Sequence, residues 1–341
     1  MLRRNLINTS LSIVIPLYNE SENVAPLIHK IHAVFLSYQF PWELILVDDG
    51  SSDDTLDKLH QIKKNYGEHL NIVALQRNFG QTAAMQAGID AARGRLIATL
   101  DGDLQNDPDD IPKLVERLLR ENLDLIVGWR KKRQDNLLIR KIPSWIANRI
   151  IGLITGVQLH DYGCSLKIYR AVVIKSVRLY GEMHRFIPAW TAIATSPKRI
   201  AEEIVQHHPR NAGKSKYGIS RSFRVILDLI SVYFFMRHRA KPGHFFGMIG
   251  LFFGFLATLI LSYLGGIKFF FGDDIGTRPL LLVGVVSLIS SLQFLTTGVV
   301  AELMARTYFE SSDVKPYLKI LEDEEEITAI ECQTGWYFPQ N

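Results

Sequence analysis

The sequence LIATLDGDLQ, residues 96–105, is an apolar, strand-like run that ends abruptly in two aspartates and a glutamine. Carboxylate and amide oxygens at alternate positions, where a buried strand gives way to a loop, can converge on one hard divalent cation. Such a cation also holds phosphates, so Asp101, Asp103 and Gln105 indicate a metal-bound nucleotide diphosphate. Asp-Gly-Asp also forms ordinary tight turns, and the neighbouring segments decide between the two interpretations.

A second strand-like run, residues 42–47, ends in the same way, in Asp48 and Asp49. Apolar and amphipathic runs predict the other elements: strands at residues 11–16, 71–76 and 124–129, and helices at residues 21–36, 81–92 and 108–121. Strands that alternate with helices predict an α/β fold with a mostly parallel sheet, whose ligands bind outside the carboxyl ends of the strands. The aspartates fall at those ends, which favours the nucleotide interpretation.

Several other classes of protein are disfavoured. No G-x-G-x-x-G and no G-x-x-x-x-G-K-[ST] motif lies near a strand end, which argues against dinucleotide cofactors and P-loop chemistry. The formal net charge is +4, and the basic residues cluster near apolar segments, so nucleic-acid binding has little support. Two cysteines, Cys164 and Cys332, predict no disulfide framework.

Three motifs follow one another along the chain: VIPLYNE at residues 14–20, VDDGSSD at 47–53 and DGD at 101–103. In order and spacing they resemble glycosyltransferase family 2, which implies a Rossmann-like GT-A catalytic domain and a nucleotide-sugar donor. Further motifs resemble the polyprenyl-phosphate hexosyltransferases, a group that includes bactoprenol glucosyltransferases and dolichol-phosphate mannose synthase: RNFG at 77–80, DLQNDP at 103–108, VGWR at 127–130, DYGC at 161–164 and RNAGKSKY at 210–217. The resemblance covers the chain from about Leu11 to the apolar C-terminal region.

The resemblance also implies roles for residues at matching positions. Donor-side residues would contact the nucleotide base and ribose or line their pocket: Asp48, Asp49, Pro16, Tyr18 and Glu20. Acceptor-side residues would hold the lipid phosphate or add positive charge beside it: Arg140, Ser144, Arg210, Lys214 and Lys216. Together with a metal, these cations would hold two polyanionic substrates in one site.

Two further residues are candidates for catalysis. Arg130 follows the predicted strand 124–129, and its planar guanidinium can bind phosphate bidentately, although a solvated surface arginine is the alternative. The family position of Asp161 implies a general base. The acceptor phosphate has a second pKa of about 6 and is mostly dianionic near neutral pH, so it does not require a base. Asp161 is therefore either a general base or a structural turn residue.

The C-terminal part contains two long apolar runs. Residues 245–267 include no charged residue, and neither do residues 279–301, and each run exceeds the roughly 20 residues that cross a bilayer. Two such runs predict a transmembrane hairpin, and a buried helical hairpin is the alternative. Small residues at Gly247, Gly250 and Gly254 permit close helix packing and hence a homo-oligomer.

Basic residues flank the two runs on the sides that face away from their connection, which predicts a cytoplasmic catalytic domain and a cytoplasmic C-terminus. The N-terminal apolar run is short and interrupted, so we expect no secretion signal. The predicted organisation is a GT-A domain at residues 1–219 that includes a basic amphipathic segment at 137–158, an interfacial helix at 220–241, a hairpin at 242–304 and a tail at 305–341.

The sequence thus predicts a cell-envelope enzyme of the inner membrane that uses Mg²⁺ or Mn²⁺. The expected reaction is inverting transfer of a hexose, glucose from UDP-glucose, to undecaprenyl phosphate at the cytoplasmic face. Three alternatives stay open: another donor such as GDP-mannose or a UDP-aminoarabinose derivative, elongation of a polysaccharide, and a non-enzymatic membrane scaffold. Processive elongating enzymes usually carry a Gln-x-x-Arg-Trp string, which this sequence lacks.

Overall fold

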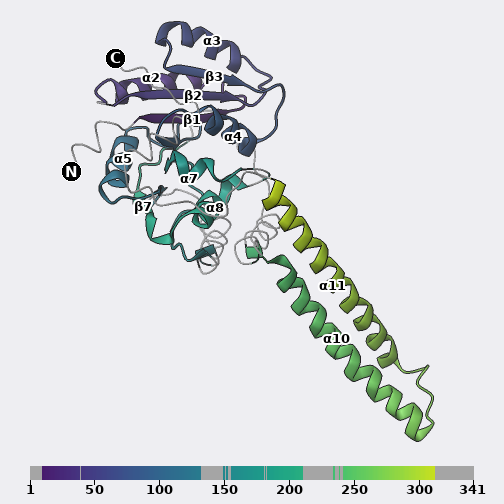
Figure 1. Ribbon diagram of the computed structural model, residues 1–341. Coiled ribbons are helices and arrows are strands. Elements are labelled where there is room, and N and C mark those ends of the chain that lie inside the picture. Colours follow the sequence, from purple (N-terminus) through teal and green to yellow (C-terminus); the bar gives the residue numbers. More distant parts are fainter. Residues whose placement is uncertain are drawn as a thin grey trace. The chain divides into compact units, whose positions relative to one another are not determined.

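The computed structural model describes residues 10–38, 40–131, 149, 151–152, 155–179, 181, 183–209, 233–234, 238 and 241–311. The chain divides into two compact units, one within Met1–Tyr233 and the other within Phe234–Pro316 (Figure 1). The first contains the sheet, and the second contains two long helices.

In the described part of the first unit, one seven-stranded sheet has the order β3-β2-β1-β4-β6-β5-β7. Its strands are β1 (Leu11–Leu17), β2 (Trp42–Asp48), β3 (Leu70–Ala74), β4 (Leu96–Thr99), β5 (Leu125–Trp129), β6 (Lys167–Arg170) and β7 (Ile200–Ile204). Strand β6 is antiparallel to both β4 and β5, and the other neighbouring pairs are parallel. The predicted α/β fold with a mostly parallel sheet is confirmed.

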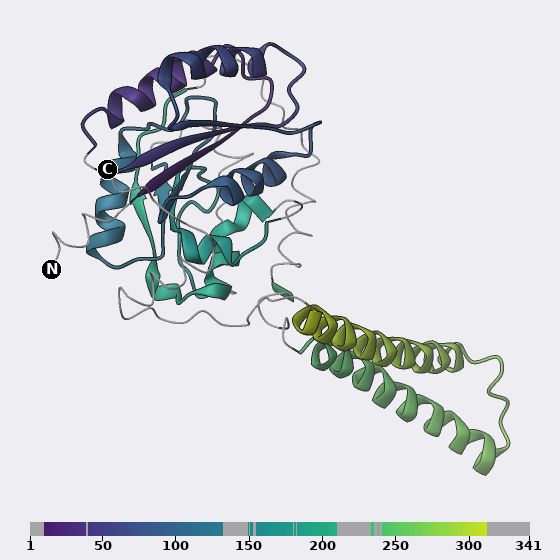
Figure 2. The same cartoon turned by 45° about the horizontal axis from the view of Figure 1, so that its top comes forward.

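Helices cover the sheet and connect its strands. They are α2 (Val24–Phe35), α3 (Thr55–Tyr66), α4 (Gln81–Ala91), α5 (Asp110–Arg120), α7 (Ala171–Lys175) and α8 (Ile187–Ala194), with short 3-10 helices η2 (Met183–Phe186) and η3 (Pro197–Arg199). In Figure 2, α2 and α3 lie over one face of the β1–β3 part and α4 lies on the other. Helix α2 shows why these segments are helical: Leu27, Ile28 and Ile31 recur at helical spacing and are fully buried.

The register of the central strands brings the predicted functional residues to one edge. Strand β1 lies between β2 and β4, with Leu17 opposite Asp48 and Val14 opposite Thr99. The backbone N–H of Asp49 then donates to the carbonyl of Leu17 (2.8 Å), which extends the pairing by one residue. Because all three strands are parallel, the segments that follow them start side by side.

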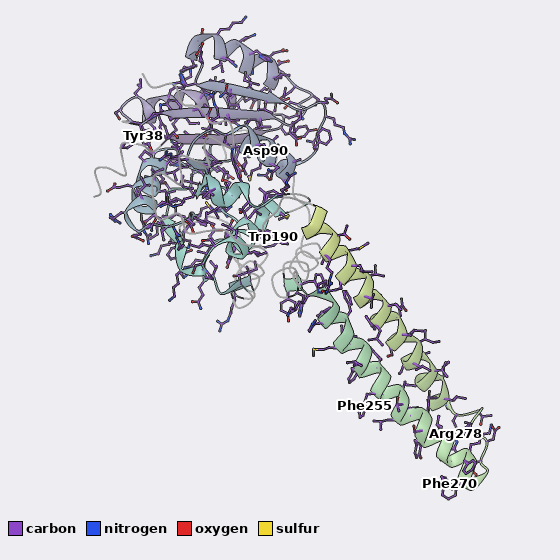
Figure 3. The ribbon with its side chains drawn as sticks, in the orientation of Figure 1. Tyr38, Asp90, Trp190, Phe255, Phe270 and Arg278 are labelled. Carbon is purple, nitrogen blue, oxygen red and sulfur yellow. The ribbon has the colours of Figure 1, made fainter. Side chains whose placement is uncertain are left out.

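The second unit contains α10 (Pro242–Gly266), a π-helical turn η4 (Ile267–Phe271) and α11 (Pro279–Ser311). Both helices are long and apolar enough to cross a membrane. Large apolar side chains point outward, among them Phe255 and Phe270, which are 67% and 78% exposed (Figure 3). Such an exposed apolar surface does not fit the alternative of a buried helical hairpin.

The small residues of α10 are used within the hairpin. The hydroxyl of Ser291 in α11 donates to the carbonyl of Gly250 (2.7 Å), and a Cβ at Gly254 would lie only 2.8 Å from the same hydroxyl oxygen. These two glycines therefore let α10 approach α11 of the same chain. Of the three predicted contact glycines, only Gly247 has open space at its Cβ, so the predicted homo-oligomer gains no support from this packing.

Candidate functional site

A pocket of about 330 Å³ opens at the carboxyl ends of β1, β2 and β4. Its described lining combines the strand ends with the first turns of α4: Pro16, Leu17, Tyr18, Glu20, Asp49, Asn78, Gly80, Gln81, Ala84, Asp101, Gly102 and Asp103. The sheet therefore brings together six residues predicted separately from the sequence. They are Pro16, Tyr18, Glu20, Asp49, Asp101 and Asp103.

The charge of this pocket restricts what can bind there. Its described lining includes four carboxylates, from Glu20, Asp49, Asp101 and Asp103, and no lysine, arginine or histidine. A nucleotide diphosphate would meet strong repulsion in such surroundings. A divalent cation removes that conflict because it attracts both the carboxylates and the phosphates.

Asp101 and Asp103 are suited to hold such a cation. Burial and the nearby charge of Asp103 raise the pKa of Asp101. The side-chain amide of Gln81, at the start of α4, donates to Asp101 Oδ1 (2.8 Å) and orients the carboxylate. In the part of the chain that the structure describes, no group of three histidine, cysteine, aspartate or glutamate residues is arranged to hold a metal alone. A cation here would need further oxygen ligands, such as the Gln105 amide and the substrate phosphates.

The loop that carries these ligands is tightly constrained. Gly102 lies against β1, where a Cβ would be 2.2 Å from Leu17 Cδ2, so a larger residue would have to displace the Leu17 side chain. Leu104 has a φ of 61°, an uncommon conformation for a residue other than glycine. The N–H of Gln105 donates back to Asp103 Oδ1 (3.2 Å). The side chain of Gln105 is not among the described lining of the pocket.

The paired aspartates after β2 differ from each other. Both oxygens of Asp49 accept backbone hydrogen bonds, from Phe79 N (2.8 Å) and Gly80 N (2.9 Å), so Asp49 fixes the loop that leads into α4. Asp48 is 1% exposed, and its Oδ2 accepts from Ser51 N (3.2 Å). Its Oδ1 is buried and has no hydrogen-bond partner among the described residues, and Asp48 is not part of the described pocket lining. Contacts of both residues with base and ribose stay predictions.

Asn19 is a residue whose role was not predicted. With a φ of 53°, it turns the chain after β1. Its N–H donates to Ser51 Oγ (2.9 Å), and its Oδ1 accepts from Ser52 N (2.8 Å). These two hydrogen bonds join the loop after β1 to the loop after β2 and position Tyr18 and Glu20 at the pocket. The available signal was an asparagine two residues after a strand, since asparagine tolerates the left-handed conformation.

Arg130 and Asp161 form a bidentate ion pair. Arg130 Nε lies 2.7 Å from Asp161 Oδ2, and Nη2 lies 3.0 Å from Oδ1. Their side chains are only 11% and 13% exposed, which excludes a solvated surface arginine. Burial alone would lower the pKa of Arg130, but the pair with Asp161 raises it above its ordinary value. The geometry gives Asp161 a clear role in orienting the guanidinium, apart from any role as a base.

Lys167 on β6 was also not predicted. It is 2% exposed, lies opposite Thr99 of β4 and Val127 of β5, and its ammonium donates to the carbonyl of Cys164. Burial lowers the pKa of Lys167, while the charge of Asp101 works in the opposite direction. A lysine in a strand of four residues gives little sequence signal, because such a strand resembles an exposed turn.

The predicted acceptor-side residues lie outside the described residues: Arg140, Ser144, Arg210, Lys214 and Lys216. The same holds for most of the amphipathic segments 137–158 and 220–241 and for most of the tail. Their roles stay predictions.

Comparisons with known proteins agree with this geometry. The model of the family "Glycosyl transferase family 2" matches residues 12–178. A dodecaprenyl-phosphate galacturonate synthase of Rhizobium johnstonii is 63% identical over 308 residues, which cover 90% of this chain and 91% of that protein. The chain belongs to glycosyltransferase family 2. Another relative, an undecaprenyl-phosphate 4-deoxy-4-formamido-L-arabinose transferase of Pseudomonas fluorescens, is 34% identical over 89% of this chain and 86% of its own length.

Solved structures show the same fold at lower identity. Glucosyl-3-phosphoglycerate synthase of Mycobacterium tuberculosis, in complex with uridine diphosphate, has a TM-score of 0.52 and 19% identity over 68% of this chain and 83% of that one. Its complex with Mn²⁺, UDP-glucose and glycerol 3-phosphate has a TM-score of 0.52 and 18% identity, covering 69% and 82%. The predicted family, GT-A fold and glycosyltransferase activity are confirmed. The named sugars of the two relatives do not support glucose.

Proposed function

We propose that this enzyme transfers galacturonate from UDP-galacturonate to a polyprenyl phosphate. The observation that carries the proposal is the 63% identity with a dodecaprenyl-phosphate galacturonate synthase, which extends over 308 residues, 90% of the chain. The acidic pocket supports a nucleotide diphosphate donor that is held through a divalent cation. Galacturonate replaces the expected glucose as the proposed sugar, because neither of the two relatives, at 63% and 34% identity, is named for glucose.

On the donor side, Asp101, Asp103 and Gln105 would hold Mg²⁺ or Mn²⁺. The bound cation would neutralise charge that develops on the departing nucleotide diphosphate. Gln81 orients Asp101, and Asp49 fixes the loop before α4, so the pocket is arranged before the donor enters. Such preorganisation favours reaction because little rearrangement is needed at the transition state.

On the acceptor side, Arg130 would face the reacting phosphates. Two of its N–H donors bond Asp161, and the others are suited to a phosphate oxygen. We assign Asp161 to positioning Arg130 instead of removing a proton, since the acceptor dianion can attack without a base. Arg140, Ser144 and Arg210 would hold the same lipid phosphate.

The two apolar helices would anchor the enzyme in the inner membrane, with the catalytic unit and the C-terminus in the cytoplasm. Their exposed apolar side chains support the membrane placement. Basic residues at the outer flanks of the two spans support the orientation. This arrangement would bring the active site to the surface where the phosphate of a polyprenyl lipid is exposed.

A screen of donors tests the proposal. Purified enzyme would be incubated with dodecaprenyl or undecaprenyl phosphate and, separately, with radiolabelled UDP-galacturonate, UDP-glucose, UDP-galactose and a UDP-formamidoarabinose. We expect lipid-extractable label from UDP-galacturonate, with much less from UDP-galactose, which carries a hydroxymethyl group in place of the carboxylate. Efficient transfer of glucose or galactose, with none of galacturonate, would refute the proposed sugar.

The second candidate donor is UDP-4-deoxy-4-formamido-L-arabinose, favoured by the 34% identity with the Pseudomonas transferase. It carries no carboxylate, so the same screen separates it from a hexuronate. The lower identity makes it the weaker candidate.

A further inference from the structure

The segment that follows β7 contacts the loop that follows β4. After β7, the N–H of Val205 donates to the carbonyl of Trp129 (3.1 Å), which continues the pairing with β5. His207 then forms an isolated antiparallel bridge with Asn106. Residues 205–208 therefore run along the loop at residues 103–107, which contains two of the three proposed metal ligands.

Two histidines of this segment contact the loop at defined atoms. The carbonyl of Gln105 accepts from the N–H of His208 (2.8 Å) and from His207 Nδ1 (3.0 Å). Since a carbonyl only accepts hydrogen bonds, Nδ1 of His207 must carry a proton. His208 Nε2 also lies 2.8 Å from Asp107 Oδ2.

Asp107 is held from a second side. Its other oxygen, Oδ1, lies 2.9 Å from Lys30 Nζ of α2, and the residue is only 5% exposed. Asp107 is thus a buried anchor at the end of the loop. The imidazole of His207 contacts the carbonyl of Gln105, whereas the imidazole of His208, like Lys30, contacts Asp107.

The loop needs such support because of its own conformation. Leu104, between Asp103 and Gln105, has a φ of 61°, which is unfavourable for leucine and persists only when surrounding contacts enforce it. Within the loop, the bond from Gln105 N to Asp103 Oδ1 (3.2 Å) is long. The hydrogen bonds from His207 and His208 are accepted by the carbonyl of Gln105, which directly follows Leu104.

We propose that His207 and His208 are positioning residues that hold the metal-binding loop in its ligand-binding conformation. The inference rests on the metal site proposed above. In this role the two imidazoles touch neither metal nor substrate. They set the affinity for the cation by fixing the backbone between Asp103 and Asp107.

The test measures Mn²⁺ binding in the presence of UDP, by the loss of the free-ion EPR signal, on the full-length enzyme. His207→Ala and His208→Ala should each weaken binding about five- to tenfold, the effect of one lost hydrogen bond. An asparagine amide nitrogen can replace Nδ1 and a glutamine nitrogen can replace Nε2. His207→Asn and His208→Gln should therefore re-form the lost hydrogen bond and restore Mn²⁺ binding to within about twofold of the parent.

Two controls separate positioning from simple stabilisation. His207→Gln, whose amide lies one methylene too far, should not restore binding. Glu203→Gln, in β7 just before residues 205–208, breaks an ion pair with Arg117 and should leave Mn²⁺ affinity within about twofold of the parent. Thermal midpoints are measured for every variant.

The outcomes distinguish the two proposals. If Asp103→Ala abolishes Mn²⁺ binding while both histidine-to-alanine variants bind like the parent, the positioning role is wrong and the metal site stands. Weakened binding that Asn or Gln does not restore, together with lower thermal midpoints, would also overturn the positioning role. Normal binding by Asp103→Ala would overturn the metal site and the positioning role together.

Discussion

Replacement of Asp161 by asparagine tests whether this residue orients Arg130 or accepts a proton. Asparagine is nearly isosteric and keeps one oxygen, but it loses the charge and places an NH₂ group against the guanidinium. The two bonds at risk are 2.7 and 3.0 Å long and lie between side chains that are 11% and 13% exposed. Solvent therefore screens these bonds poorly, and their loss should change the orientation of Arg130.

The size of the effect follows from these contacts. Loss of a charge-assisted hydrogen bond costs about 1.5–3 kcal/mol. At about 1.4 kcal/mol for each factor of ten in rate, kcat should fall about 10- to 150-fold. A positioning role predicts the same loss at pH 6, 7 and 8. Loss of a general base instead costs about 10²- to 10⁴-fold, and most at low pH, where the acceptor phosphate is protonated.

The assay is the pH dependence of kcat with the lipid acceptor at saturation. Glu203→Gln is a matched control, because Glu203 pairs with Arg117 (2.5 Å) between α5 and β7, away from the described pocket lining. It should leave kcat unchanged. A loss at pH 6 that is tenfold or more greater than the loss at pH 8 would refute the positioning role.

Three other predictions concern the metal, acid stability and topology. Asp103→Ala or EDTA should abolish transfer, because several kcal/mol of charge stabilisation are lost; full activity in either would contradict the metal site. Burial, and then the charges of His69 and His29, lower the pKa of His32 to about 4 from 6.5. The unfolded state binds the proton more tightly, so stability is complete above pH 6.5 and falls as pH drops towards 4, by about 1 to 2 kcal/mol after allowance for partial exposure. His32→Gln should flatten this part of the curve of thermal midpoint against pH, and an unchanged slope would contradict it. A cysteine placed at Gly276 should react with an impermeant reagent from outside intact cells, whereas a reporter after Gln340 should be cytoplasmic; the same side for both would refute the hairpin.

The sequence alone predicted the strands that are marked by a local run of apolar residues. The apolar runs predicted β1, β2 and β4 within about a residue or two, because each strand is buried and ends in polar residues that cannot continue it. Their shared edge followed from parallel pairing. For the same reason, the sequence pattern was enough to place Asp49, Asp101 and Asp103 in one pocket.

Features that depend on distant contacts were not predictable. Strand β6 has four residues and starts and ends with charged ones, so only its pairing with β4 and β5 makes it a strand. Asp48 and Asp49 look equivalent in the sequence, yet one carries an oxygen without a partner among the described residues and the other binds the loop before α4. The bond from His207 to Gln105 spans 102 residues, which no local pattern encodes.

The reversed direction of β6 explains how Arg130 and Asp161 meet. An antiparallel strand begins at the edge where its parallel neighbours end. Residues that precede β6 therefore arrive at the carboxyl ends of β4 and β5, which carry Asp101 and Arg130 respectively. A parallel β6 would have placed Asp161 at the opposite edge, about the length of a strand away. The reversal of β6 thus brings a segment from after β5 to the edge at which the parallel strands β4 and β5 end.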